Sequence, residues 1–327
     1  MPLSSSDILN LIPVLTDAHK KTPIEPRIEA MDSLLNIDNF HSVEPTLIDS
    51  ILPIVLKRLD DKPKVVEKAT ELGLYIVSNT SIQAFPLIAE CLFTELQMDS
   101  KWKCKLGSLK ILGHYIDRVE KFDRDLLSAC LPELVNQITE ILYDTKVEVA
   151  ELAEEVLRKA MKGITNRDLE PFVEDLIMTM KNRDETEETI QKLGGIVFVQ
   201  TVEGSALSVV IPLMIEGFRT GKSMTKRMCA RIVSNMSKLV EEPLEAKPFL
   251  KDLIPVLGDA IDTISDPEAR EVATKTHESL INMNQKAIQE ENNKLFRKHS
   301  HISDQISSKL SSNNSDISII YCAYIIA

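Results

Sequence analysis

Residues 51–77 read ILPIVLKRLDDKPKVVEKATELGLYIV, a pattern of two helices in tandem. Apolar residues recur at helical spacing from Ile51 to Leu59, and a polar break follows at residues 60–63. Apolar residues then return every three or four positions from Val65 to Val77, as on a helix with one buried face. The segment therefore predicts a pair of amphipathic helices joined by a short turn, with aspartate at the turn capping the second helix.

Related phrases recur along the chain, each marked by a proline. These prolines are Pro13, Pro53, Pro86, Pro132, Pro171, Pro212 and Pro255. Most intervals between them lie near the 40 to 47 residues of helix-pair repeats of the HEAT and armadillo type. Because proline fits the first turn of a helix, where its missing N–H would have no partner, we expect each proline to mark a helix start. The sequence predicts an all-α, right-handed solenoid of about seven HEAT-type helix pairs over residues 1–285.

Residues 286–327 depart from this pattern. They are polar and of low complexity, with a serine- and asparagine-rich run at 307–315, and helical periodicity is lost after about Leu295. We expect a disordered tail that runs past the natural domain junction, in a truncated product. The apolar end at 317–327 is shorter than the roughly 20 residues that a membrane helix needs, so no membrane partner is expected.

Composition excludes several classes of function. Only 10 of 327 residues are glycine, which argues against glycine-rich nucleotide folds, and the net charge of -12 disfavours binding of DNA or RNA by the whole surface. Strand signals are nearly absent, and the apolar run at 195–199 fits a buried helix. The five cysteines form no CxxC pair and the six histidines show no metal-binding spacing. We therefore expect no metal and a reducing, cytoplasmic location.

One segment imitates a phosphate-binding loop. Residues 217–223 read GFRTGKS, but only three residues separate the two glycines, where the G-x-x-x-x-G-K-[ST] template has four. The segment also lies between two expected helices, whereas the template follows a strand. We interpret it as the turn of the sixth repeat, with Gly221 ending the first helix. Since no nucleophile, base and oxyanion site assemble elsewhere, the sequence predicts no cofactor, no catalytic residues and no enzyme activity.

Basic residues gather at two of the expected turns. In a solenoid equivalent turns stack, so these residues would line one edge and could bind RNA phosphates or an acidic partner. The candidates are Arg219, Lys222, Lys226, Arg227 and Arg231 in the sixth repeat and Lys101, Lys103 and Lys105 around Trp102 in the third.

Several segments resemble a known family. These are Lys101-Trp102, Leu131-Pro132-Glu133-Leu134, NRDLEPF at 166–172, NMSKLVEEP at 235–243 and DPEAREV at 266–272. In order and spacing they are similar to the N-terminal HEAT domain of fungal-type translation elongation factor 3. The resemblance implies a ribosome-binding module of translation elongation, which contacts ribosomal RNA and proteins between the head of the small subunit and the central protuberance of the large one. That family's tandem ABC ATPase domains, which drive tRNA release from the exit site, have no counterpart here.

The resemblance therefore implies a fragment or paralogue without ATPase activity. Lys226 and Arg227 match the turn that is also basic in the family. Three alternatives stay open: a HEAT segment like that of the large activator that couples stalled ribosomes to a stress kinase, a non-ribosomal HEAT scaffold that binds proteins, and an enzyme in its own right.

Overall fold

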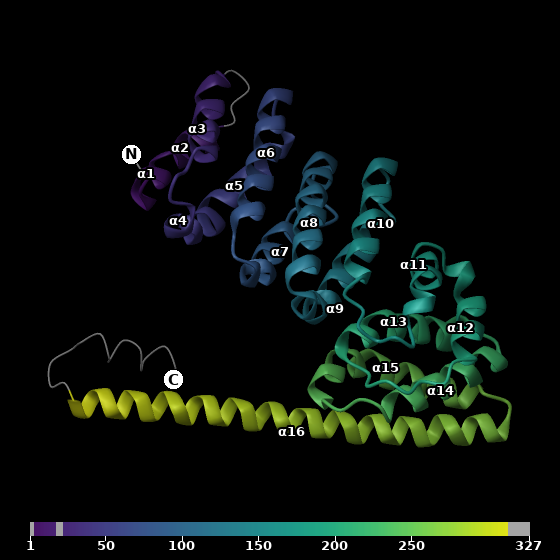
Figure 1. Ribbon diagram of the computed structural model, residues 1–327. Coiled ribbons are helices and arrows are strands. Elements are labelled where there is room, and N and C mark those ends of the chain that lie inside the picture. Colours follow the sequence, from purple (N-terminus) through teal and green to yellow (C-terminus); the bar gives the residue numbers. More distant parts are fainter. Residues whose placement is uncertain (1–2, 18–21, 313–327) are drawn as a thin grey trace.

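The computed structural model describes residues 3–17 and 22–312, of which 298–312 are described by their backbone alone (Figure 1). Every regular element among these residues is a helix. The helices follow one another as seven pairs, each containing or directly following one of the seven prolines. The prediction of an all-α array of helix-pair repeats is confirmed.

The repeats differ in how their first helix is built. Repeat 1 begins with α1 (Ser5–Asn10) and α2 (Ile12–Thr16), and repeat 2 with α4 (Phe40–Thr46), a π-helical segment (Leu47–Ile51) and α5 (Leu52–Lys57). The first helices of repeats 3 to 7 are α7 (Phe85–Phe93), α9 (Arg124–Ile141), α11 (Val173–Lys181), α13 (Gly204–Thr220) and α15 (Pro243–Thr263). Short 3-10 segments are Arg58–Asp60, Ile82–Ala84, Glu170–Phe172 and Arg183–Glu185.

The second helices are simpler, with one continuous helix in each repeat. They are α3 (Glu25–Leu35), α6 (Pro63–Asn79), α8 (Trp102–Phe122), α10 (Val147–Met161), α12 (Thr186–Gly194), α14 (Ser223–Ser237) and α16 (Pro267–Ser312). Their apolar faces and those of the first helices join one long core. Residues at the centre of these faces, such as Leu72, Leu112 and Leu157, are fully buried.

The prolines do not all mark helix starts. Pro13, Pro53 and Pro86 lie in the first turn of a helix, as predicted. The prediction is wrong for three others, because Pro132, Pro212 and Pro255 lie inside α9, α13 and α15. Each of these helices buries an apolar face on both sides of its proline, so packing holds the helix across the one backbone hydrogen bond that proline removes.

Aspartate at the turns acts in two ways. Asp266 caps α16 as expected, since its carboxylate accepts the N–H of Ala269 at 3.3 Å. Asp61 and Asp144 instead accept N–H groups inside the turn, from Lys62 at 2.7 Å and Lys146 at 2.9 Å. They stabilise the turn and leave the N-cap position of α6 and α10 to a lysine.

The array changes direction at repeat 5. Helices α3, α6, α8 and α10 stand side by side, whereas α13, α15 and α16 run across them (Figure 1). The first helix of repeat 5, α11, has 9 residues, against 18 in α9 and 17 in α13. Such a helix is about half as long as its neighbours and does not fill the space between them. As a result α9 packs directly against α13.

Two segments differ from expectation. The helix α16 passes residue 285 without a break and reaches Ser312, so the helix does not end near Leu295 as expected. A disordered tail over 286–327 stays a prediction. No glycine or proline follows Pro267 within it, and Ala287 is still buried. Residues 195–199 are not helical: Phe198 is buried while Val197 is 78% exposed. The apolar stretch 317–327 lies outside the described residues.

Candidate functional site

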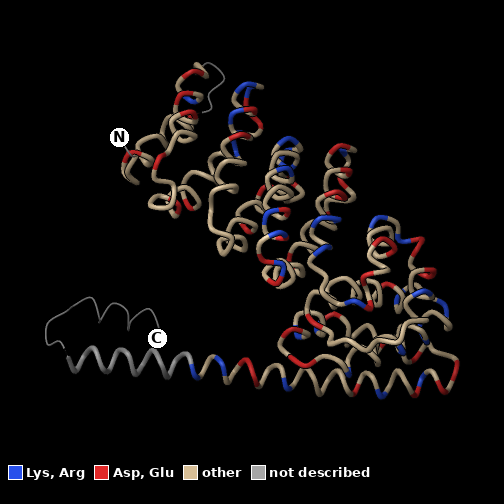
Figure 2. Tube along the Cα trace, in the orientation of Figure 1, with Lys and Arg blue, Asp and Glu red and all other residues tan. Residues whose placement is uncertain are grey.

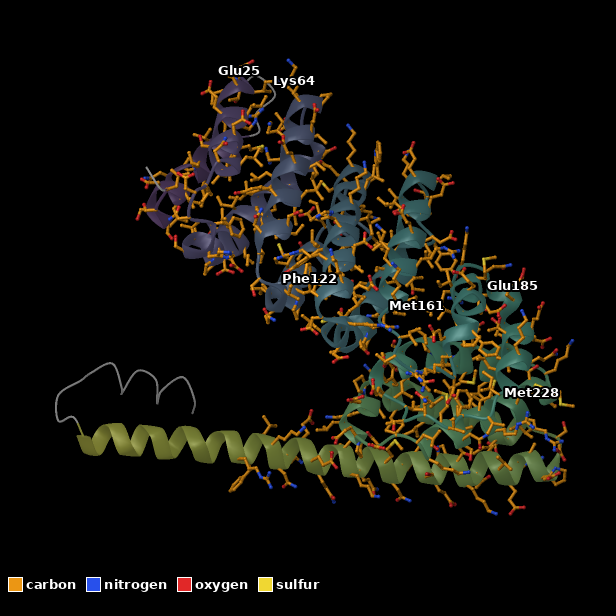
Figure 3. All side chains as sticks on the ribbon, in the orientation of Figure 1. Glu25, Lys64, Phe122, Met161, Glu185 and Met228 are labelled. Carbon is orange, nitrogen blue, oxygen red and sulfur yellow. The ribbon has the colours of Figure 1, made fainter. Side chains whose placement is uncertain are left out.

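The turns between the two helices of each repeat lie along one edge, which we call the turn edge. It comprises residues 58–62, 94–101, 142–146, 182–185, 220–222 and 264–266. Figure 3 labels Lys64 at this end of α6 and Phe122 at the far end of α8. Ion pairs join consecutive repeats near this edge, as between Arg27 of α3 and Asp61 at 3.6 Å and between Arg183 and Glu216 of α13 at 3.9 Å. Figure 2 shows Lys and Arg at the turn-edge ends of α6 and α8.

The first candidate cluster surrounds Trp102, which is 38% exposed. The ammonium groups of Lys103 and Lys146 each lie 5.8 Å from the centroid of its ring, within the range of cation–π attraction. Lys101 lies 2.6 Å from a carboxylate oxygen of Asp60 in the preceding repeat, and this hydrogen bond raises the pKa of Lys101. The cluster therefore presents three lysines and one aromatic face at the turns of repeats 3 and 4.

Lys105 is not part of that surface. Its side chain is 8% exposed and its ammonium group lies 2.9 Å from Asp144, which is 11% exposed. Burial alone would raise the pKa of Asp144, but the N–H of Lys146 and the ammonium of Lys105 outweigh it and lower that pKa. The prediction that Lys105 contacts an external partner is therefore corrected, because this lysine joins repeats 3 and 4 from inside.

The second candidate cluster contains both free and engaged cations. Arg219 and Lys222 are exposed, and their side chains have no partner among the described residues. Lys226 donates to the hydroxyl of Thr263 at 2.8 Å, and Arg231 donates to the carbonyl of Gly194 at 2.6 Å. Both bonds reach into neighbouring repeats, so these two side chains stabilise the array while remaining at its surface.

Arg227 is the most strongly engaged member of this cluster. Its guanidinium lies 3.2 Å from Asp266 and 3.5 Å from Glu268. These carboxylates belong to repeat 7 and neutralise much of its charge. Arg227 is still 48% exposed, so a phosphate could compete with the two carboxylates for it. Because it is already paired, we expect it to contribute less to phosphate binding than Arg219 or Lys222.

A recurring feature of the turn edge escaped the sequence analysis. The residue that immediately precedes a second helix, its N-cap, is a lysine in repeats 2, 3, 4 and 6: Lys62, Lys101, Lys146 and Lys222. None of these side chains caps the helix, because lysine offers no acceptor for its first N–H groups. The signal that could have found Lys62 and Lys146 was their position just before a periodic helix start.

This lysine series is interrupted twice. Repeat 5 has Glu185 as the N-cap of α12, with Asp184, Glu187 and Glu188 beside it. Repeat 7 has Asp266 at the equivalent position. The turn edge therefore offers two separate basic surfaces, one over repeats 2 to 4 and one at repeat 6.

The glycine-rich segment 217–223 has a helical setting. Gly217 lies inside α13, and the N–H of Gly221 donates to the Gly217 carbonyl at 3.0 Å. The expected end of the first helix at Gly221 is confirmed.

No cluster of three or more histidine, cysteine or acidic residues suited to a metal ion occurs within 3–17 and 22–312, the side chains of 298–312 left aside. Burial raises the pKa of the Cys91 and Cys104 thiols to about 11. No helix in the part of the chain that the structure describes has the length and apolarity to cross a bilayer.

Two family profiles match the chain, one before α11 and one after it. The profile described as "EF3 N-terminal HEAT repeat" matches residues 7–157, which is the array from α1 to most of α10. The profile described as "Elongation factor 3/GNC1 HEAT repeat" matches residues 184–292, from the turn before α12 into α16. The unmatched interval contains α11, where the array changes direction.

Curated relatives agree with these profiles. Elongation factor 3 of Phytophthora infestans is 36% identical over 71% of this chain and 22% of its own length. Elongation factor 3 of Eremothecium gossypii is 34% identical over 80% of this chain and 25% of its own length. Elongation factor 3B of Saccharomyces cerevisiae is 34% identical over 73% of this chain and 22% of its own length. The chain thus spans about a quarter of the length of the curated relatives it matches.

Among solved structures, the chain is similar to an engineered protein, with a TM-score of 0.32 and 16% identity over 85% of this chain and 97% of the other. It is also similar to a designed armadillo repeat protein, with a TM-score of 0.27 and 13% identity over 82% of this chain and 99% of the other.

Proposed function

The chain belongs to the elongation factor 3 HEAT-repeat family, and on this premise we propose that it is a ribosome-binding module of translation elongation in the cytoplasm. Its partners in this proposal are ribosomal RNA, bound through phosphates along the turn edge, and ribosomal proteins. The residues present here supply binding and no catalysis. The two HEAT-repeat profiles match residues 7–157 and 184–292 of this chain.

The lysines at the N-caps carry this proposal. At an N-cap, asparagine, aspartate, serine and threonine stabilise a helix because they accept its free N–H groups. A lysine accepts none and adds positive charge where the helix dipole is already positive. Four such lysines at equivalent turns therefore cost stability, and a phosphate placed there would gain from both the lysine and the helix end.

Ribosome co-sedimentation tests the proposal directly. We expect the wild-type chain to pellet with ribosomes at moderate salt. The quadruple variant Lys62→Gln, Lys101→Gln, Lys146→Gln and Lys222→Gln should bind roughly tenfold or more weakly, with a shallower salt dependence because fewer counterions are released. Circular dichroism should show an unchanged helix content.

The chain offers a matched control for this variant. Lys110, Lys238, Lys251 and Lys286 are exposed, have no side-chain partner among the described residues and lie off the turn edge. Changing these four to glutamine removes the same charge and should leave pelleting within about twofold of wild type. Equal loss in both variants would show that only net charge matters, and would refute binding through the turn edge.

Three further outcomes separate the alternatives. The profile that matches 184–292 also names GNC1, so a HEAT segment of a stress-kinase activator is a second candidate, distinguished by pelleting with ribosomes only when that kinase is also present. A chain that never pellets with ribosomes would be a non-ribosomal scaffold. Purified chain should turn over no ATP, and measurable turnover would contradict the proposal that it supplies binding alone.

A further inference from the structure

A groove lies at the edge opposite the turn edge, where the first helices of repeats 4, 6 and 7 begin. It has a volume of about 720 Å³. Its sides come from the N-terminal halves of α9, α13 and α15, and Thr165 from the loop after α10 closes it. The helices meet there because the short α11 leaves α9 in contact with α13. We call this groove the acidic groove; its lining residues all lie outside the turn edge.

The groove carries uncompensated negative charge. Asp125, Glu203 and Glu245 line it, and no lysine or arginine among the described residues does. Glu203 accepts the hydroxyl of Thr165 at 3.0 Å and Glu245 accepts the N–H of Gly204 at 2.7 Å, so each retains free acceptor capacity. Asp125 is exposed and its carboxylate has no partner among the described residues.

The two nearest cations along the chain are engaged elsewhere. Arg124, next to Asp125, donates to the carbonyls of Lys162 at 2.8 Å and Ile164 at 3.0 Å. Lys247, two residues after Glu245, pairs with Glu291 of α16. Acidic residues in the first turn of a helix do favour the helix dipole. That preference explains each carboxylate alone, but it does not explain why three of them share one hollow without a cation.

A second observation points to an absent partner. Ser205 lines the groove and is 2% exposed, yet its hydroxyl has no hydrogen-bond partner among the described residues. A buried hydroxyl without a partner costs free energy, which a ligand's donor or acceptor would recover. Ser128, on the facing helix α9, lines the same groove and is 6% exposed.

The chemistry of the lining favours a peptide over a metal ion or a polyamine. The three carboxylates do not form a cluster able to hold a metal ion. The lining also contains the apolar residues Ala129, Pro132, Pro248 and Phe249. A polyamine offers cations but no apolar side chains or carbonyls, whereas an extended basic peptide offers all three. We propose that the acidic groove binds a segment of a partner protein in which basic and apolar residues alternate.

Fluorescence anisotropy with a labelled peptide of alternating arginine and valine tests this on the whole chain near physiological salt. We expect saturable binding by the wild type. The variant Asp125→Asn, Glu203→Gln and Glu245→Gln keeps its oxygen acceptors, so the fold should persist while the peptide binds roughly tenfold or more weakly. The matched control Glu148→Gln, Glu151→Gln and Asp184→Asn removes three exposed carboxylates outside the groove, which have no ion-pair partner among the described residues. This control should bind as wild type.

Two single substitutions make the test independent of the triple variant's stability. Ala129→Lys places a cation on the exposed, helical lining of α9 and should abolish peptide binding. Ser205→Ala removes the unpaired hydroxyl and should weaken peptide binding severalfold without lowering the midpoint of unfolding. Equal weakening in the control variant, no binding by the wild type, or full competition by spermine would each overturn the proposal. No ribosome takes part, so failure here leaves the proposed function untouched.

Discussion

At Gly221 the chain leaves no room for a β-carbon. A β-carbon there would lie 2.4 Å from the carbonyl oxygen of Gly217 and 2.8 Å from the side chain of Thr225. The backbone itself is extended and ordinary, so the glycine serves close approach between α13 and α14 and not an unusual torsion angle. The apparent phosphate-loop glycine is thus explained by packing.

Replacement of this glycine should therefore destabilise the turn of repeat 6. We expect Gly221→Ala to lower the free energy of unfolding by about 1–3 kcal/mol, because backbone must move to admit the methyl group. Gly195→Ala is the control: the closest atom to its β-carbon would be the Lys192 carbonyl oxygen at 3.4 Å, and as the C-cap of α12 it has right-handed torsion angles that alanine adopts readily. Urea denaturation should place the control at or above wild type, and equal destabilisation by both would contradict the packing argument.

The buried pair of Lys105 and Asp144 gives a pH-dependent prediction. Lys105→Met should cost about 3 kcal/mol at pH 7, because it leaves the largely buried carboxylate of Asp144 without its ion-pair partner. Since the pKa of Asp144 is lowered in the folded chain, the pair stabilises the fold above the carboxyl's unfolded pKa of about 4 and loses this effect as pH falls through the lower folded value. The difference between wild type and variant should therefore shrink toward pH 3.

Urea titrations at pH 7 and pH 3 measure this difference. Lys101→Met is the comparison, because Lys101 is 72% exposed and its pair with Asp60 is screened by water. We expect that variant to unfold close to wild type at both pH values. A pH-independent loss in Lys105→Met would mean that the lysine acts through its packed chain and not through its charge.

Among the helices, the N-cap lysines predict a conflict between stability and binding. Lys62 and Lys222 have the extended backbone of an N-cap and no side-chain partner among the described residues. Lys62→Ser and Lys222→Ser should each raise the free energy of unfolding by about 1 kcal/mol, because serine accepts an N–H of the first turn. The same variants should bind ribosomes more weakly. If they gain stability and keep full binding, the lysines have no role in contact with RNA.

The elements show what the sequence could and could not predict. Periodic apolar residues and prolines predicted seven helix pairs because that pattern is local. Whether Pro132 begins a helix or lies inside one depends on packing on both sides of it, which the sequence does not display. Residues 195–199 look like a buried helix but form a loop, because Asp168 accepts the N–H groups of Val199 at 2.8 Å and Gln200 at 3.0 Å. Likewise, Lys105 and Lys101 look alike in sequence, and only the fold separates them.

Over the whole molecule, the change of direction at repeat 5 organises both edges. It separates the two basic surfaces of the turn edge, and it brings α9 against α13 so that the acidic groove forms on the opposite edge. The two family profiles end and begin around the same repeat. In a repeat array, stability is a sum of repeats and of the interfaces between neighbours, so an altered interface divides the array into units of different stability.

The two units should therefore unfold at different urea concentrations. Trp102, the chain's single tryptophan, reports on repeats 1 to 4 by fluorescence, whereas far-ultraviolet circular dichroism reports on all helices. We expect the two midpoints to differ.

Leu112→Ala and Leu257→Ala each remove a fully buried side chain, at a cost of about 2–5 kcal/mol, one in α8 and one in α15. Leu112→Ala should shift the fluorescence midpoint, and Leu257→Ala should leave it in place while shifting part of the dichroism signal. If Leu257→Ala moves both signals together, repeat 5 transmits unfolding as fully as any other repeat, and the array is one cooperative unit.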